Sequence, residues 1–356
     1  MKKKNIIFNL IVLAIVTGLT LYYLISSDLF KDIGKLKSIS ASGIIIILLL
    51  IVAYVLADSY IISHSMRKIN KSAMLTDGIG AYLTGNLGSN ITPWKIGHFP
   101  FCLYYYNRKK YTFEETLTIV CENHLVYSVC LCFLYTIFMI IALINNFTVT
   151  IGDIKLKLYL VSLFGTLSNI VYIIFIILLI KNQKLQSLLL KIQVLFTKKF
   201  KKDVNIEDYI RDKEIKMKVY VKCFDDLFHH FSTYLKPIFS YLIFMLTNYG
   251  LPYVIYLVVS KESFNINDYF YFFLLLQAMR YVSNIIPIPG GTGVTEYCFI
   301  TVYELAMGKS LVTTVLLVWR ILTYFMFIIV DFIYFLIFNS KNQIETIKEL
   351  DKKDAN

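Results

Sequence analysis

Long apolar runs alternate with short polar segments along this chain, and each run is about as long as a helix that crosses about 30 Å of hydrocarbon. We predict six full spans, at about residues 6–25, 43–63, 117–144, 158–180, 237–259 and 311–338. The first run follows Lys2-Lys3-Lys4 and so begins like a signal peptide. Its apolar part is too long for a signal peptide and no A-x-A site follows it, so we expect it to be retained as a span. The pattern predicts an all-α polytopic membrane protein.

Two further apolar segments, at about residues 76–106 and 269–307, are broken by proline and glycine. These residues remove helix donors or permit a positive φ, so no continuous α-helix can pass through them. Backbone groups freed inside a bilayer must be satisfied by protein or by a cavity. We therefore predict two re-entrant helical hairpins, each built from two half-helices. The breaking residues are Pro93 and Gly97 in the first segment and Pro287, Pro289, Gly290, Gly291 and Gly293 in the second.

The basic residues predict opposite orientations for the two hairpins. Lys and Arg flank the first segment on both sides, at residues 67–71 and 108–110, so it enters and leaves on the cytoplasmic side. With cytoplasmic N- and C-termini, the second hairpin enters from outside. Residues 1–340 then form one membrane domain of two inverted half-repeats, at about 1–150 and 155–340. The alternative is eight ordinary helices with glycine kinks.

Two segments lie outside this repeat. Residues 181–236 are rich in lysine, with apolar residues at helical spacing, and we interpret them as a cytoplasmic amphipathic insertion at the membrane surface. Residues 341–356 form a short tail, which we expect to be cytoplasmic.

Composition and charge narrow the class of protein. Apolar residues make up 57% of the 356 residues, and the net charge of +12 comes from Lys and Arg in the loops between apolar runs. This is the positive-inside signature, so we expect no nucleic-acid partner. The abundance of Lys, Ile, Asn, Tyr and Phe points to an AT-rich, bacterial genome and hence to the bacterial plasma membrane. Neither the six cysteines nor the glycine stretch has the spacing of a metal, dinucleotide or P-loop site, so we expect no cofactor.

Ionisable residues at membrane depth are candidate functional residues. In the second half, Arg320 and Glu296 offer a guanidinium for a lipid phosphate and a carboxylate that orients it. The equal alternative is a structural ion pair that locks the hairpin to the last span. Arg280 lies before the second break, and Lys95 and His98 lie beside the first, where free N–H groups and a cation could hold an anionic headgroup. Lys95 could instead extend to the interface.

Three acidic residues within apolar segments form a second candidate set. Asp58, Glu122 and Asp331 could relay protons across the membrane, although their spacing alone does not establish this.

The chain resembles a flippase-like membrane family, that of the transmembrane region of lysylphosphatidylglycerol synthases. The resemblance rests on Asn90-Ile-Thr-Pro93 with Gly97 and Pro100, on the stretch from Pro287 to Glu296, and on Arg320 with Tyr324 in the last span. It implies movement of a phospholipid, such as an aminoacylated phosphatidylglycerol, between leaflets. It also implies a headgroup site that includes Asn90 and Thr92, and a homodimer. Where family members have Gly-Gly and then Glu or Gln, this chain has Gly97 followed by His98-Phe99, so the headgroup preference does not carry over directly.

Two alternatives to transport remain, a non-transporting scaffold and a catalytic membrane enzyme. The synthases of this family append a soluble aminoacyl-transferase domain, and a tail of residues 341–356 is too short to fold as one, so we expect no lysyltransferase activity. The chain could instead be a scaffold for a separate lipid- or glycan-modifying enzyme, docked through residues 181–236.

Overall fold

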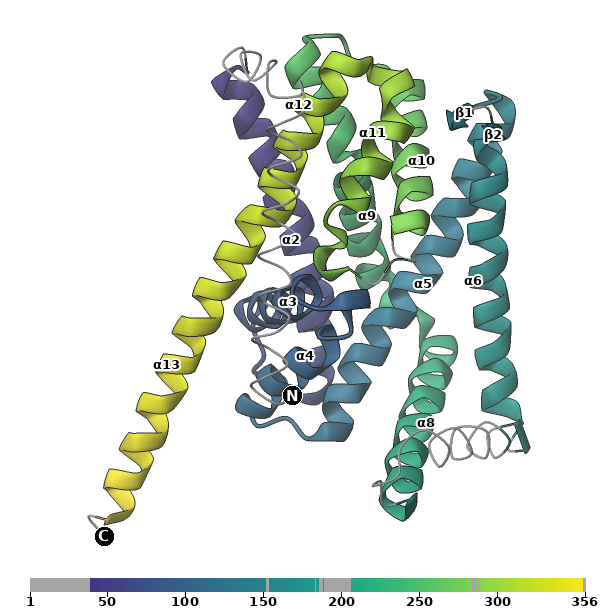
Figure 1. Ribbon diagram of the computed structural model, residues 1–356. Helices are drawn as coiled ribbons and strands as arrows, with labels where there is room; N and C mark the ends of the chain where they lie inside the picture. The colour runs from purple at the N-terminus through teal and green to yellow at the C-terminus, as the bar shows by residue number, and fades with distance from the viewer. Residues whose placement is uncertain are drawn as a thin grey trace.

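The computed structural model describes residues 39–151, 154–182, 184, 185, 188, 206–283, 286 and 288–354. The predicted first span, Pro287 and residues 189–205 of the insertion lie outside the described residues. The described chain is almost entirely helical (Figure 1).

Long apolar helices build the frame of the molecule, and five within the described residues are long and apolar enough to cross a membrane. They are α2 (Ala41–Ile69), α5 (Phe113–Ile144), α6 (Leu158–Lys181), α9 (Phe231–Ser260) and the last span, which comprises α12 (Lys309–Arg320), a π-helical turn η4 (Ile321–Phe325) and α13 (Met326–Asp354). Each coincides with a full span predicted from the sequence. The prediction of an all-α, multi-pass membrane protein is thereby confirmed. Helix α9 begins at Phe231, within the range that the sequence assigns to the insertion.

Both proline- and glycine-rich segments break into two short helices. In the first, α3 (Leu75–Asn90) and α4 (His98–Arg108) flank a 3₁₀ turn, η2 (Pro93–Lys95). In the second, α10 (Ile266–Ser283) and α11 (Val294–Met307) flank another, η3 (Pro289–Gly291). Figure 1 shows α3 and α4 in the lower half of the bundle and α10 and α11 in the upper half. The breaks are therefore present, while the re-entrant course and the inverted repeat stay predictions.

The backbone at each break adopts conformations that explain the residues found there. In the first break, residues 91–97, Trp94 and Lys95 have φ values of 49° and 58°, which non-glycine residues rarely adopt. In the second break, of which residues 286 and 288–293 are described, Gly290 and Gly293 have φ values of 63° and 86°. Glycine adopts a positive φ at little cost, so the second break is not strained at these positions. In the first break, the positive φ values fall on non-glycine residues and are strained. Strained non-glycine residues persist where surrounding structure fixes them, often at functional sites.

One element, a β-hairpin, was not predicted. A β-hairpin pairs β1 (Thr148–Ile151) with β2 (Ile154–Lys157), with Thr148 opposite Lys157. Its β-branched residues favour strands, but the runs are too short to stand out between two spans. Within the insertion, α8 (Ile206–His229) packs against α5 and α6.

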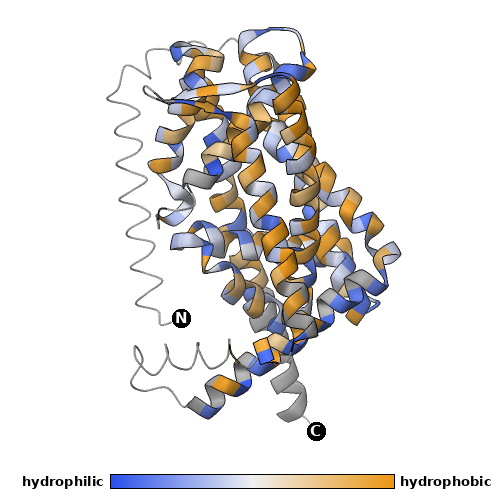
Figure 2. Cartoon of the chain, turned by 90° about the vertical axis from the view of Figure 1, so that its right-hand side faces the viewer, coloured by the Kyte–Doolittle hydropathy of each residue, from blue (hydrophilic) through white to orange (hydrophobic). Residues whose placement is uncertain are grey.

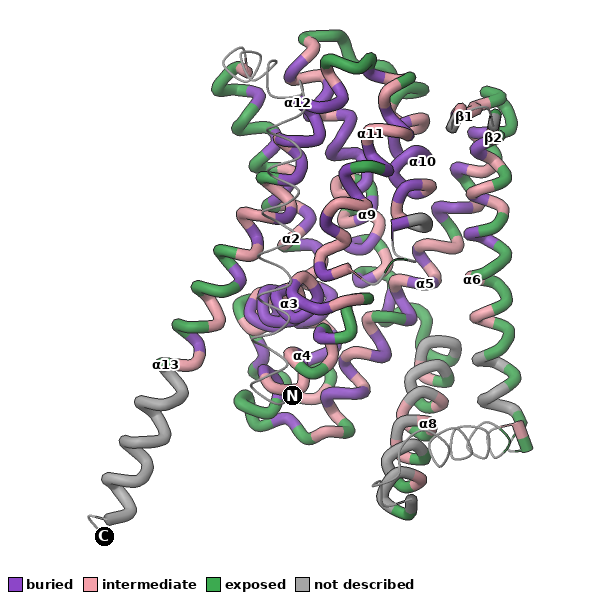
Figure 3. Tube along the Cα trace, in the orientation of Figure 1, coloured by how far each residue is buried: buried purple, intermediate pink, exposed green. Residues whose placement is uncertain are grey.

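Apolar side chains cover the outside of the long helices as well as the core. Figure 2 shows hydrophobic residues along the helices, and Figure 3 shows exposed positions on the outer sides of α2, α6 and α13. Phe164, Val171 and Ile329 are each at least 60% exposed. An apolar surface of this kind is expected where the solvent is lipid.

Helix α3 approaches α2 closely at Gly78. A Cβ atom at Gly78 would collide with the backbone carbonyl oxygen of Ser59, and backbone cannot move aside as a flexible side chain can. Small residues permit such contacts between membrane helices.

We expect Gly78→Ala to lower the free energy of unfolding by about 1–3 kcal/mol, the usual cost of overpacking. Thr76→Ala, at an exposed position of the same helix, serves as the control. Thermal unfolding in detergent measures both. Equal melting temperatures for the two variants would contradict this account of the α2–α3 contact.

Candidate functional site

The two helix breaks lie against each other, although they are far apart in the sequence. The turn η2 contacts η3, and α3 also contacts η3. Between them and the helices α2, α9, α10 and α12 lies a cavity of about 450 Å³, the central cavity. Its polar lining includes Asn86, Asn90, Thr92, Asn248, Ser283, Thr295 and Thr323.

The second break is fixed to the last span by a buried ion pair. Arg320 Nε donates to Glu296 Oε1 at 2.5 Å, and the two residues are only 6% and 3% exposed. Glu296 Oε2 accepts from the backbone N–H of Gly293 at 2.6 Å, and an Arg320 Nη2–H points toward the Gly290 carbonyl oxygen at 3.5 Å. The structural alternative from the sequence is therefore realised: this pair locks the break to the span. Arg320 also lines the central cavity.

Tyr324 completes this attachment one turn along the last span. The Arg320 guanidinium lies over the Tyr324 ring, 4.4 Å from its centroid. The Tyr324 hydroxyl lies 3.2 Å from the Thr292 hydroxyl, and its ring fills the space where a Cβ atom at Gly290 would stand. The π-helical turn at residues 321–325 carries Tyr324, and such turns are frequent at functional sites.

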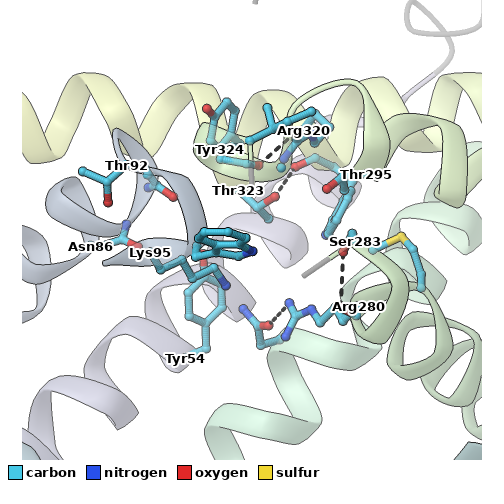
Figure 4. Close-up of a pocket in the computed structure, with 18 of the residues that line it drawn as sticks. Tyr54, Asn86, Thr92, Lys95, Arg280, Ser283, Thr295, Arg320, Thr323 and Tyr324 are labelled. Atoms are coloured by element: carbon cyan, nitrogen blue, oxygen red, sulfur yellow. Dashed lines mark hydrogen bonds between the residues drawn. The ribbon is translucent and has the colours of Figure 1, made fainter. Parts of the chain in front are cut away.

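Lys95 and Arg280 present cations to the central cavity without an acidic partner. Figure 4 shows both side chains pointing into the cavity, with Arg320 and Tyr324 on another wall. Arg280 donates to Asn248 Oδ1 at 2.6 Å and lies 4.2 Å from the centroid of the Tyr249 ring. Among the described residues, neither cation has a carboxylate within ion-pair distance.

A second, smaller cavity shares these two cations. It measures about 300 Å³, and Lys95 and Arg280 line it together with residues of α5, α6, α9 and α10. We call it the side cavity. Gln277 belongs to its wall and is 1% exposed, and its Nε2 has no hydrogen-bond partner among the described residues.

The charges that line the central cavity are predominantly positive. Lys95, Arg280 and Arg320 oppose one carboxylate, that of Asp58. Phosphate is matched by guanidinium and ammonium groups, which supply directed, charge-assisted N–H donors. The arrangement can therefore hold an anion.

Of the residues predicted beside the first break, the structure brings most, but not all, to the cavity. Asn90, Thr92 and Lys95 line it. Thr92 Oγ1 donates to the Gly88 carbonyl at 2.7 Å and accepts from the Gly97 N–H at 2.8 Å, so it holds the break together. The ring of His98 points elsewhere and lies 3.2 Å from the Ser89 hydroxyl, joining α4 to α3.

The three acidic residues proposed as a relay lie in different surroundings. Asp58 lines the central cavity, and Asp331 accepts from Asn86 Nδ2 at 2.8 Å. Glu122 accepts from Lys68 Nζ and from the Tyr234 hydroxyl, each at 3.1 Å. The described hydrogen bonds join none of the three to another.

Sequence reasoning missed several uncharged site residues. Asn86 and Asn248 line the cavity and hold Asp331 and Arg280, respectively. An amide in an apolar helix is the signal that could have found them, because such a group needs a partner in a membrane. The described residues contain no group of three His, Cys, Asp or Glu side chains placed to bind a metal ion.

The sequence places this chain in a known group of membrane proteins. Residues 6–330 match the family described as lysylphosphatidylglycerol synthase TM region. The chain belongs to this family. The match includes both helix breaks, the central cavity and Arg320, and it supports a membrane-lipid-related function. A comparison with curated proteins found no match.

The buried pair predicts a distinctive double-mutant cycle. Glu296→Gln or Arg320→Gln alone leaves a buried charge without its partner, so we expect each to lower stability by about 3–5 kcal/mol. The double variant Glu296→Gln/Arg320→Gln removes both charges and should recover much of that loss.

Thermal unfolding of all four proteins in detergent measures this coupling. Additive losses, with the double variant least stable, would show that the pair does not hold the break.

Proposed function

We propose that this protein moves a phospholipid with an anionic phosphate between the two leaflets of a bacterial plasma membrane. The observation that carries the proposal is the central cavity, where two helix breaks meet and three cations converge. The phosphate of the headgroup would lie between Lys95 and Arg280, and the acyl chains would remain among the apolar helices.

The lack of acidic partners for two cavity cations, among the described residues, favours an anionic phosphate as the ligand. Lys95 and Arg280 lack acidic partners among the described residues, and an unpaired cation within a membrane is costly. A phosphate would supply the missing negative charge. Arg320 is already paired with Glu296, so its task is to hold the second break.

The two breaks suggest how access could alternate. Inverted hairpins that meet at a central site let small movements of one half against the other expose the site to either side. The positions of α3–α4 and α10–α11 in opposite halves of the bundle fit such a repeat (Figure 1). In this arrangement, the N- and C-termini of the chain both lie on the cytoplasmic side of the membrane. Phosphatidylglycerol and its lysyl derivative are the first lipids to test, given the family of the chain.

Transbilayer movement in liposomes tests the proposal. Purified protein is reconstituted with labelled phosphatidylglycerol or lysyl-phosphatidylglycerol in one leaflet, and the rate of appearance in the other is followed. We expect Lys95→Gln and Arg280→Gln each to slow movement roughly tenfold or more, because each removes a charge-assisted contact to phosphate.

The matched control is Lys155→Gln, which removes an exposed cation on β2 outside the central cavity. It should move lipid at the wild-type rate. Size-exclusion profiles confirm that all variants are folded. Lipid movement that is unchanged in both cavity variants would place the site elsewhere, and a folded wild-type protein that moves no lipid would favour the scaffold alternative.

A further inference from the structure

Asp331 is a carboxylate fully enclosed within the last span. Its exposed fraction is 0%. One oxygen, Oδ2, accepts from Asn86 Nδ2 at 2.8 Å, and the other, Oδ1, has no hydrogen-bond partner among the described residues. An ionised carboxylate without a cation is among the most costly groups to bury, whereas a protonated carboxyl is neutral.

Aromatic side chains surround Asp331, and none of the described ion pairs includes it. Phe327 lies one turn before it and contacts the ring of Tyr54 from α2 and the ring of Tyr82 from α3. Both tyrosines lie within electrostatic range of Asp331, and Tyr82 also lies within electrostatic range of Asp58. No Lys, Arg or His of the described residues pairs with it.

Asp331 is nevertheless connected to the central cavity. Its partner Asn86 lines that cavity, as do Tyr54, Tyr82 and Asp58. A single hydrogen bond therefore connects Asp331 to a side chain of the cavity wall.

Two of the bonds between the last span and the broken segments differ in kind. Arg320 binds Glu296 of α11 as an ion pair, and Asp331 binds Asn86 of α3 with a single amide. The first bond joins two opposite charges that balance each other. The second depends on whether Asp331 carries a proton, since an ionised Asp331 would need water or a cation to approach it.

We propose that Asp331 carries a proton that is transported together with the anionic phospholipid. This inference rests on the proposed function and names a proton gradient as the force that drives lipid movement. In the described state Asp331 is protonated and its span is closed on α3. When its surroundings open to one side of the membrane, the O–H bond breaks, the proton passes to the water of that compartment, and the carboxylate keeps the electron pair.

The charges of this cycle balance. One phosphatidylglycerol carries one negative charge on its phosphate, and one proton carries one positive charge, so their movement together is electrically neutral. A pH difference should then drive lipid against its concentration gradient, while a membrane potential alone should not. With one proton for each lipid, a difference of one pH unit supports up to about tenfold accumulation.

The experiment uses the full-length protein in liposomes that contain labelled phosphatidylglycerol, with a pH difference of one unit or none. We expect wild-type protein to accumulate lipid in the leaflet facing the alkaline side, into which the proton is released. Asp331→Asn is nearly isosteric and mimics the protonated form. It should still equilibrate lipid but lose all dependence on the pH difference. Asp268→Asn, at an exposed carboxylate at the start of α10, should behave as wild type.

Several outcomes would overturn the inference. Lipid movement by wild-type protein that ignores the pH difference removes proton coupling and leaves the proposed function intact. A pH dependence that persists in Asp331→Asn but is lost in Asp58→Asn assigns the proton to Asp58. If wild-type protein moves no lipid under any condition, the proposed function fails first.

An infrared measurement tests the protonation state without any transport. The difference spectrum of wild type minus Asp331→Asn at neutral pH should contain the C=O stretch of a protonated carboxyl group. Carboxylate bands in its place would show that Asp331 is ionised in the resting protein and would overturn the inference.

Discussion

The ion pair between Glu296 and Arg320 holds the part of the fold on which the site depends. A helix that breaks within a membrane leaves backbone N–H and C=O groups that need partners. Glu296 accepts from the Gly293 N–H, and Arg320 reaches toward the Gly290 carbonyl. One pair of side chains therefore binds two backbone groups of the break, and the two opposite charges balance each other. Because the pair is internal to this corner, Lys95 and Arg280 remain to give the cavity its positive charge.

The first break is not held by an ion pair of this kind among the described residues. Thr92 closes it with neutral hydrogen bonds to Gly88 and Gly97, and Trp94 and Lys95 adopt left-handed conformations that place the Lys95 side chain in the cavity. Lys95 from the first half of the chain and Arg280 from the second half therefore line one cavity. An anionic headgroup is the ligand that this arrangement fits.

The frame of the fold and the positions of the two helix breaks could be predicted from the sequence. Apolar length predicted the spans, and proline and glycine predicted the breaks, because both effects are local. The meeting of the breaks depends on tertiary packing, so Asn86 and Asn248 could not be assigned to Asp331 and Arg280 from sequence. His98 was predicted from its neighbourhood in the chain, but the helix α4 turns its ring toward Ser89. The choice between a free and a paired Arg320 also required the structure.

A structure determined with phosphatidylglycerol present would test the central claim most directly. The account predicts the lipid phosphate within hydrogen-bond distance of both Lys95 Nζ and the Arg280 guanidinium, with the Glu296–Arg320 pair intact. A phosphate bound elsewhere, or lipid present only on the outer faces of α2, α6 and α13, would contradict it.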